Sequence, residues 1–236
     1  MKNILEVEKI NKFLDKKQIL FDVSFSVKEA EIYGFIWPNW AWKTTAMKAI
    51  LGLIKPESGV IKIFWNNWIN IEVKKQIWFM PENTYLYKYL TGREFLKFNW
   101  KFFDLTWKNL EKIIDELLVK VWLEDDGDKL LKKYSKWMLQ RIGLAQSIIN
   151  KPKLVFLDEP MSGLDPIWRK MVKDLLVELK QNGTTVFFNT HILADVESIC
   201  DRISIIHKWK IIVSGKEVSE IKGWLEEFFI EKVSEK

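Results

Sequence analysis

Residues 32–51 read IYGFIWPNWAWKTTAMKAIL, and this stretch decides the fold. The run 32–36 is short, apolar and rich in β-branched and aromatic residues, which is typical of a buried strand. Residues 45–51 have a helical pattern. A strand that passes through a tight loop into a helix indicates an α/β protein, and the loop, residues 37–44, ends in Lys43 and Thr44.

This loop matches a phosphate-binding pattern everywhere except at its glycines. With Gly in place of the three Trp, residues 37–45 would read GPNGAGKTT and fit G-x-x-x-x-G-K-[ST] between a strand and a helix. Backbone N–H groups must wrap the phosphates closely, partly at positive φ, and only glycine does this without strain. An indole at position 37 or 42 is therefore expected to occupy the space that the phosphates need.

Tryptophan stands where glycine is expected elsewhere too. The chain has 13 Trp and only 10 Gly in 236 residues, whereas glycine usually makes up about 7% of a protein. We infer that one codon, glycine in the source organism, has been read as tryptophan, as with a reassigned stop codon. The competing hypothesis is a degenerate protein that binds no nucleotide. The other positions that suggest glycine are Trp78, Trp137 and Trp168 in motifs, and Trp65, Trp122 and Trp209 in expected turns.

The rest of the chain continues the α/β pattern. Apolar runs alternate with helical patterns at 138–150 and 171–180, which predicts a mostly parallel sheet. Shorter, partly polar runs predict a small antiparallel layer near the N-terminus, and residues from about 83 to 151 read as an inserted helical region. The predicted parallel-sheet strands are 32–36, 154–157, 185–188, 203–206 and 211–213, and those of the antiparallel layer are 4–7, 19–27 and 60–64.

Composition limits the function. No run approaches the roughly 18 apolar residues of a membrane span, and the first residues lack a signal-peptide core, so we expect a cytoplasmic protein. The net charge of +5 is spread along the chain without a basic run, and no nucleic-acid partner is expected. Cys200, the single cysteine, is predicted to be a small buried hydrophobe.

Four further segments carry polar groups in a suggestive order: Ser135 to Met138, Asp158-Glu159 after an apolar run, Ser162 to Asp165, and Thr190-His191. Each alone has a plainer explanation, such as an N-cap for Ser135 or a solvated turn for the two carboxylates. Their order favours a common site. Lys43 and Asp158 lie 115 positions apart (158 − 43), which leaves room for the helical insert.

With glycine restored, the chain resembles an ATP-binding cassette (ABC) ATPase up to about residue 230. The loop at 37–45 is similar to its phosphate loop, 154–159 to the Walker B segment and 162–165 to the D-loop. Residues 134–138 resemble the family signature in a YSKGM form. The resemblance implies an α/β P-loop NTPase with a mostly parallel sheet, an N-terminal antiparallel β layer and a helical subdomain at about 83–151, within one domain at 1–236.

The resemblance also implies roles. Lys43 would neutralise β- and γ-phosphate oxygens, Thr44 and Asp158 would hold Mg²⁺, Glu159 would polarise the attacking water, and His191 would contact the γ-phosphate. Glu82, where the family commonly has Gln, could also approach Mg²⁺ or the water. The expected ATP-binding residues are Phe13 (for adenine, although the expected position is nearer Leu14), Trp37, Pro38, Asn39, Trp40, Ala41, Trp42, Lys43, Thr44, Thr45, Glu82, Ser135, Trp137 and Asp165.

The same resemblance implies partners. The chain has one phosphate loop, and in the family the signature reaches ATP held by the other subunit, so a dimer with two ATP molecules is expected. Segments 90–96 and 225–230 resemble ABC-2 type exporters, which implies a separate integral membrane permease subunit and a place on the inner face of the cell membrane. The region of Tyr85 to Tyr89 would dock on this permease. A catalytically inactive module and a soluble, non-transport ABC ATPase remain the alternatives.

Overall fold

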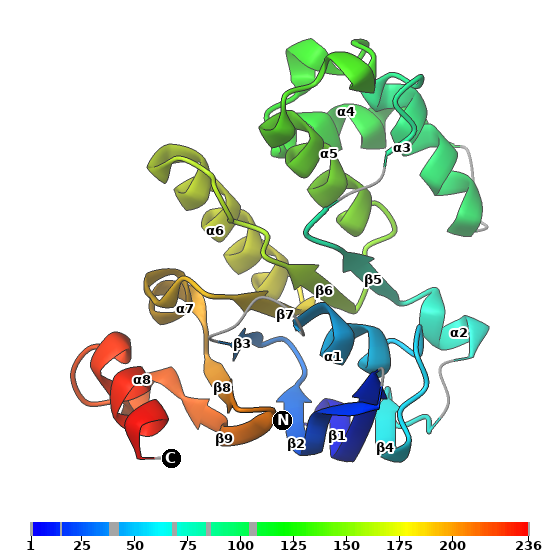
Figure 1. Cartoon of the computed structure of the whole chain (residues 1–236). Coiled ribbons are helices and arrows are strands. Elements are labelled where there is room, and N and C mark those ends of the chain that lie inside the picture. The colour runs from blue at the N-terminus through cyan, green and yellow to red at the C-terminus, as the bar shows by residue number, and fades with distance from the viewer. Residues whose placement is uncertain are drawn as a thin grey trace.

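A computed structural model describes residues 2–14, 16–37, 43–67, 70–83, 86–103 and 108–235, without the side chains of Lys43 and Thr44. Two sheets and a layer of helices make up the molecule (Figure 1). The strands are β1 (Asn3–Leu14), β2 (Lys17–Lys28), β3 (Ile32–Ile36), β4 (Ser58–Ile63), β5 (Ile77–Met80), β6 (Leu154–Asp158), β7 (Thr185–Thr190), β8 (Arg202–His207) and β9 (Lys210–Glu217). The helices are α1 (Lys43–Ile50), α2 (Ile71–Lys74), α3 (Gly92–Trp100), α4 (Leu110–Lys120), α5 (Lys136–Ile148), α6 (Pro166–Gln181), α7 (Leu193–Ile199) and α8 (Leu225–Ser234).

The larger sheet has six strands in the order β5-β6-β7-β3-β8-β9. All neighbours pair in parallel except β8 and β9, which are antiparallel. This confirms the predicted mostly parallel sheet and five of its strands. The sixth, β5, was not predicted as a strand, because its four residues IWFM are too short a run to be told from a loop.

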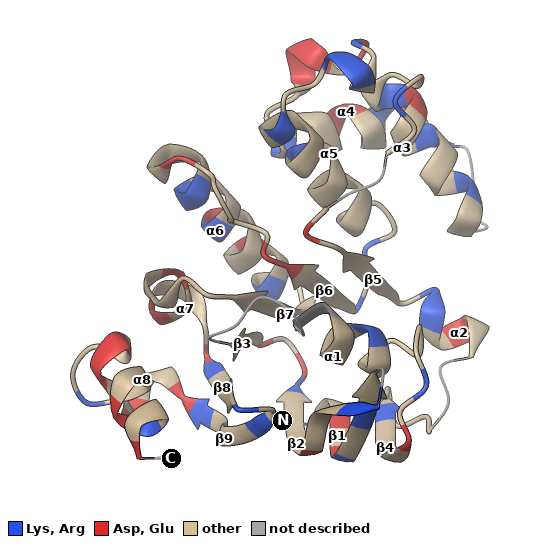
Figure 2. Cartoon of the chain, viewed as in Figure 1, with Lys and Arg blue, Asp and Glu red and all other residues tan. Residues whose placement is uncertain are grey.

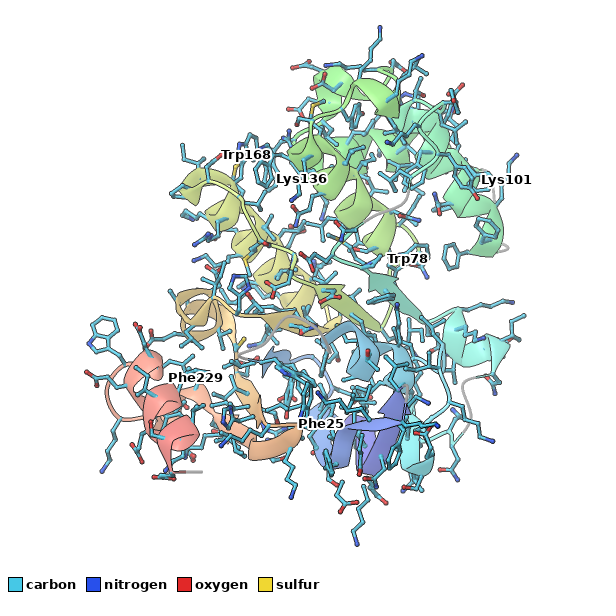
Figure 3. All side chains as sticks on the ribbon, in the orientation of Figure 1. Phe25, Trp78, Lys101, Lys136, Trp168 and Phe229 are labelled. Atoms are coloured by element: carbon cyan, nitrogen blue, oxygen red, sulfur yellow. The ribbon has the colours of Figure 1, made fainter. Side chains whose placement is uncertain are left out.

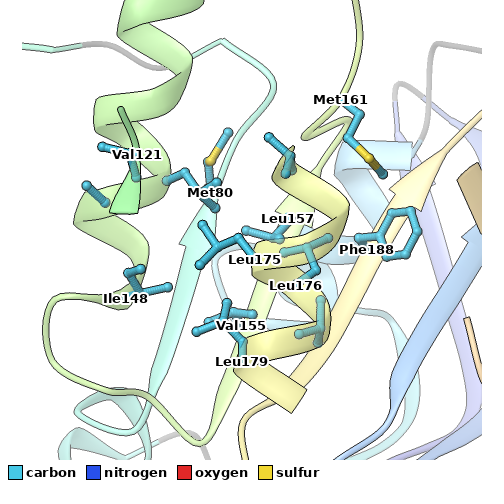
Figure 4. Close-up of a cluster of buried hydrophobic side chains, with 14 of the residues drawn as sticks. Met80, Val121, Ile148, Val155, Leu157, Met161, Leu175, Leu176, Leu179 and Phe188 are labelled. Atoms are coloured by element: carbon cyan, nitrogen blue, oxygen red, sulfur yellow. The ribbon is translucent and has the colours of Figure 1, made fainter. Parts of the chain in front are cut away.

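Strand residues alternate between two apolar cores. On β6, Val155 and Leu157 face one core, which α6 covers with Leu175, Leu176 and Leu179 (Figure 4). Phe156 faces the other core, where its ring centroid lies 5.3 Å from that of Phe187 on β7. Because both faces of the sheet are covered, its strands are almost continuously hydrophobic.

The second core lies between the six-stranded sheet, α1 and a three-stranded antiparallel sheet of order β2-β1-β4. This sheet is the predicted N-terminal antiparallel layer. At the opposite end of the molecule, α3, α4 and α5 form a helical layer (Figure 1). Within the described residues between 86 and 151 there is no strand of either sheet, as expected for the helical insert.

Lys and Arg residues and Asp and Glu residues are interspersed over the sheets and the helical layer (Figure 2). Cys200 is buried as predicted, and burial raises the pKa of its thiol. Its Sγ approaches Gly34 of β3 so closely that a Cβ there would lie 2.9 Å away. None of the helices in the described ranges has the length and apolar character needed to span a bilayer.

Candidate functional site

The polar residues predicted from sequence gather at one edge of the six-stranded sheet. Strands β6, β7 and β3 are parallel neighbours, so their carboxyl ends meet at the same edge. Asp158 pairs with Asn189, and Thr190 pairs with Ile36, the last residue before the loop. The register therefore brings the ends of the two polar segments and the start of the phosphate loop side by side.

Asp158, a predicted Mg²⁺ ligand, is held by a residue that sequence reasoning missed. The Asn189 side chain donates a hydrogen bond from Nδ2 to Oδ1 of Asp158 at 2.8 Å. The same nitrogen lies 3.3 Å from Sδ of Met47 on α1. Both polar residues are buried, at 1% and 0% exposure. The sequence did contain a signal for this contact: Asn189 interrupts the apolar and β-branched run TVFFNT of β7. The side-chain amide of a buried Asn needs a hydrogen-bond partner.

Glu159, the predicted catalytic carboxylate, contacts the predicted switch histidine. Its Oε1 is 2.8 Å from Nδ1 of His191, and its Oε2 accepts a 3.3 Å hydrogen bond from the Thr190 hydroxyl. Glu159 is 3% exposed, whereas the His191 side chain is 35% exposed. The carboxylate is thus oriented from β7, beside the loop that follows β3.

The backbone of Glu159 adopts φ of +51°. For a residue with a side chain this left-handed conformation is uncommon and costs about 1–3 kcal/mol. Such strain persists where the surroundings hold it in place. Here the Glu159 N–H donates to the carbonyl of Asn189 at 3.0 Å, and the Glu159 carbonyl accepts from the N–H of Ser162 at 3.1 Å.

The described parts of the phosphate loop correct one expectation. Trp37 is 2% exposed, and its ring lies in the second core, 6.2 Å from that of Phe35 and 6.4 Å from that of Trp209. The expectation that this indole fills the phosphate space was therefore wrong, because the β3 register turns the side chain into the core. Thr45 is half-buried on α1. Pro38, Asn39, Trp40, Ala41 and Trp42 lie outside the described residues, as do the side chains of Lys43 and Thr44.

The signature segment lies at the start of α5, whose first residue, Lys136, is labelled in Figure 3. Ser135 is its N-cap, with Oγ accepting from the N–H of Met138 at 3.2 Å. Trp137 follows it, 38% exposed, with its ring against the segment 162–165: a Cβ on Gly163 would lie 2.7 Å from that ring. At the end of this segment, Asp165 caps α6 by accepting from the N–H groups of Ile167 and Trp168.

Two further predicted residues lie on β1 and just beyond β5. Glu82 is exposed just beyond β5, which pairs in parallel with β6, so it follows the same edge of the sheet. Phe13, the residue predicted to stack on adenine, lies on β1 of the antiparallel sheet and is 43% exposed. Its N–H donates to Oε2 of Glu57 at 2.9 Å.

A buried charge cluster joins α6 to α7 behind Glu159. The carboxylate of Asp195 is 1% exposed and lies 3.7 Å from Nε of Arg169 and 3.6 Å from Nζ of Lys173. Burial raises the pKa of this carboxyl, the two cations oppose the rise, and the charge of Glu159 adds to it. Asp195 therefore ties the helix after His191 to the helix after the segment 162–165.

The edge has the chemistry of a magnesium and phosphate site. The buried oxygen of Asp158 is a hard ligand of the kind that Mg²⁺ prefers, and α1, which begins at Lys43, presents the positive end of its helix dipole after the loop. Within the described chain, no group of three His, Cys, Asp or Glu side chains forms a metal cage. Mg²⁺ bound with a nucleotide needs only one or two protein ligands besides phosphate oxygens and water.

Known proteins resemble this chain closely. A family model described as ABC transporter matches residues 20–162. An uncharacterized ABC transporter ATP-binding protein of Nostoc sp., all4389, is 43% identical over 202 residues, 85% of this chain and 60% of that protein. The bacitracin transport ATP-binding protein BcrA of Bacillus licheniformis is 37% identical over 215 residues, 90% of this chain and 69% of its own length.

The fold agrees with solved structures. One described as an ATP binding subunit of an ABC transporter matches with a TM-score of 0.89 and 28% identity, covering 97% of this chain and 99% of the other. The chain spans 60% of the Nostoc relative and 65% of sll0415 from Synechocystis sp.. The matched family model covers more than half of the chain, and the relatives agree with it, so this chain belongs to the family of ABC transporter ATP-binding domains.

Proposed function

We propose that this chain, with glycine in place of the tryptophans of its phosphate loop, binds and hydrolyses ATP and drives export through a separate membrane subunit. The observation that carries the proposal is the contact of Glu159 with His191 at the sheet edge where the phosphate loop begins. A buried carboxylate, an exposed imidazole and the end of β3, which leads into the phosphate loop, lie at this edge and support a site for a nucleoside triphosphate. Membership of the ABC transporter ATP-binding family supports nucleotide binding.

Each residue of the site has a proposed role in this reaction. Lys43 neutralises the β- and γ-phosphates and, with the N-terminal end of α1, fixes them. Asp158, oriented by Asn189, and Thr44 would hold Mg²⁺, which offsets phosphate charge when bound. Glu159 accepts a proton from the attacking water, while His191 donates a hydrogen bond to the γ-phosphate.

A second copy of the chain would complete each site. The chain offers one phosphate loop, and the N-terminal end of α5, capped by Ser135, is a natural anion site because its first N–H groups point outward. We propose that this end of α5 and the segment 162–165 face ATP held by the other copy. Two ATP molecules would then hold the dimer together.

The test is Glu159→Gln in the chain with glycine at 37, 40, 42 and 137. This variant should bind ATP normally and form a stable ATP-dependent dimer, while phosphate release falls by about 10²- to 10⁴-fold, the usual contribution of a general base. Size-exclusion chromatography with and without Mg-ATP, together with a phosphate assay, gives both results. Parent-like hydrolysis, or a monomer at saturating ATP, would overturn the proposed mechanism.

We further propose that the natural protein has glycine where this sequence has tryptophan. Trp65, Trp122 and Trp209 have φ of +63°, +55° and +73°, a region that glycine occupies freely and bulky residues rarely enter. All three were predicted from sequence to lie in turns. Trp78 of β5 and Trp168 of α6 show no positive φ, so their backbones do not call for glycine.

Mass spectrometry of the peptide covering positions 37–45, from the natural host, decides between the two residues. The proposal predicts glycine at 37, 40 and 42. Tryptophan in that peptide would favour the alternative function, an ABC-like module that does not hydrolyse ATP.

An exposed aromatic surface on the helical layer supports a membrane-bound partner. The rings of Tyr87, Phe98 and Phe102 form two edge-on contacts, at centroid distances of 5.3 and 5.2 Å. Tyr87 and Phe102 are 61% and 62% exposed, and Tyr89 is 85% exposed. Tyr85 lies outside the described residues. We propose that this surface docks on the permease at the inner face of the membrane, since clustered exposed aromatic rings favour protein contacts.

A further inference from the structure

Gln140 connects the helical layer to the turn that carries Glu159. It lies in the second turn of α5, half-buried. Its Nε2 donates to the carbonyl of Pro160 at 2.7 Å and to that of Glu159 at 3.2 Å. A single amide group with two hydrogens thus contacts two successive carbonyls directly after β6.

These two carbonyls belong to the strained part of the chain. Glu159 has φ of +51°, and a residue with a side chain keeps such a conformation only where its surroundings hold it. The Asn189 carbonyl on β7 accepts a hydrogen bond from the Glu159 N–H, and the Ser162 N–H, within the turn, donates to the Glu159 carbonyl. Gln140 adds a restraint from a different layer of the molecule.

The direction of the Glu159 side chain depends on that backbone. A change of peptide orientation at residues 159 and 160 would rotate the Cα–Cβ bond of Glu159 and move its Oε1 away from His191, now 2.8 Å distant. We propose that Gln140 is a positioning residue that fixes the catalytic carboxylate from α5, the helix whose first turn is the signature segment. This inference rests on the proposed ATPase function.

The test removes the Gln140 amide in the glycine form of the chain, defined as the form with glycine at 37, 40, 42 and 137. Gln140→Ala should lower kcat roughly ten-fold, because small displacements of a catalytic group reduce rates by one to two powers of ten. The KM for ATP should stay within about two-fold, since the Gln140 amide contacts the carbonyls of Glu159 and Pro160 and has no proposed role in binding ATP. Gln146→Ala is the matched control: its Nε2 donates to Oδ1 of Asn99 at 2.7 Å, within the helical layer, and its kcat should equal the parent's.

Two readouts separate positioning from a merely structural role. In a Glu159→Gln background, Gln140→Ala should cause no further loss of rate, because residues that act through one group are not additive. Amide hydrogen exchange across residues 159–163 should accelerate in Gln140→Ala and stay at the parent rate in Gln146→Ala.

The outcomes are distinct. Parent-like kcat and parent-like exchange in Gln140→Ala would overturn the positioning role while leaving the ATPase proposal intact. An additive loss in the Glu159→Gln background would also overturn it. A glycine-form parent that binds ATP but releases no phosphate would overturn the proposed function, and with it the inference.

Discussion

The two edges of the six-stranded sheet both gather polar side chains, yet they use them differently. At the amino-terminal edge, Asp201 accepts from the N–H of Ile32 at 2.8 Å and from Nζ of Lys180 at 2.6 Å. Beside it, Glu31 lies 3.3 Å from Arg202. At the carboxyl-terminal edge, Asp158 accepts a hydrogen bond from the Asn189 amide, and Glu159 contacts the Thr190 hydroxyl and the His191 imidazole.

The difference suggests a division of roles within one sheet: the amino-terminal edge stabilises the fold, and the carboxyl-terminal edge carries the groups for ATP turnover. At the first edge, hydrogen bonds and ion pairs join the starts of the strands to neighbouring elements. Adjacent buried carboxylates, held by groups that orient them, instead favour the binding of a cation or of a proton from water. Substitutions at the first edge should therefore change unfolding, and those at the second should change ATP turnover.

The largest expected effect is at the carboxyl-terminal edge. In the glycine form, Lys43→Ala should weaken Mg-ATP binding by about 100-fold or more, because charged hydrogen bonds to phosphate are lost, and should prevent the ATP-dependent dimer. Calorimetry and size-exclusion chromatography measure the two effects. Lys48→Ala, which removes an exposed lysine from the same helix, should bind as the parent does. Equal affinity for both variants would mean that the phosphates lie elsewhere.

At the amino-terminal edge, Asp201→Ala should lower the free energy of unfolding by about 2 kcal/mol, the cost of losing hydrogen bonds to a charged group. Its kcat, measured well below the melting temperature, should stay within two-fold of the parent's. Urea unfolding together with phosphate release tests both statements. A variant of unchanged stability with a large loss of kcat would contradict the claim that the amino-terminal edge serves stability and not ATP turnover.

Sequence reasoning gave the sheet because strands buried on both faces are continuous apolar runs, as in 154–157 and 185–188. It grouped Asp158, Glu159 and His191 in one site through the order of their motifs and the resemblance to ABC ATPases, and the structure brings them to one edge because parallel strands end together. The contacts of Asn189 and Gln140 could not be predicted, since they join residues 31 and 19–20 positions apart through side-chain geometry that no periodicity encodes. The burial of Trp37 was missed for a different reason: it continues the two-residue alternation of Tyr33 and Phe35, which lie in the same core, and the predicted strand ended at residue 36.

A smaller effect tests the tryptophans through stability. Trp65→Gly should raise the free energy of unfolding by about 1 kcal/mol, because it relieves a left-handed backbone conformation of an exposed residue. Trp224, 69% exposed with φ of −80°, is the matched control, and Trp224→Gly should give no gain. Thermal or urea unfolding compares the two. A loss of stability in Trp65→Gly would argue that tryptophan is the native residue there.

Glu31→Gln should have the smallest effect on the free energy of unfolding, and the size of this effect should vary with pH. Burial raises the pKa of Glu31 above 4.5 in the folded state, against the effects of Lys28 and Arg202. The ionised carboxylate therefore costs stability above this pKa, and the cost disappears as pH falls through it. The stability of the variant relative to the parent should rise between acidic and neutral pH. A difference that stays flat or falls would contradict the assignment.

The most direct measurement of the central claim is calorimetric titration of Mg-ATP into two forms of the chain. One is the printed sequence, and the other is the glycine form. The account predicts saturable binding by the glycine form and no measurable heat of binding for the printed sequence, because the phosphate cradle requires glycine. Equal affinity in both forms, or no binding in either, would contradict it.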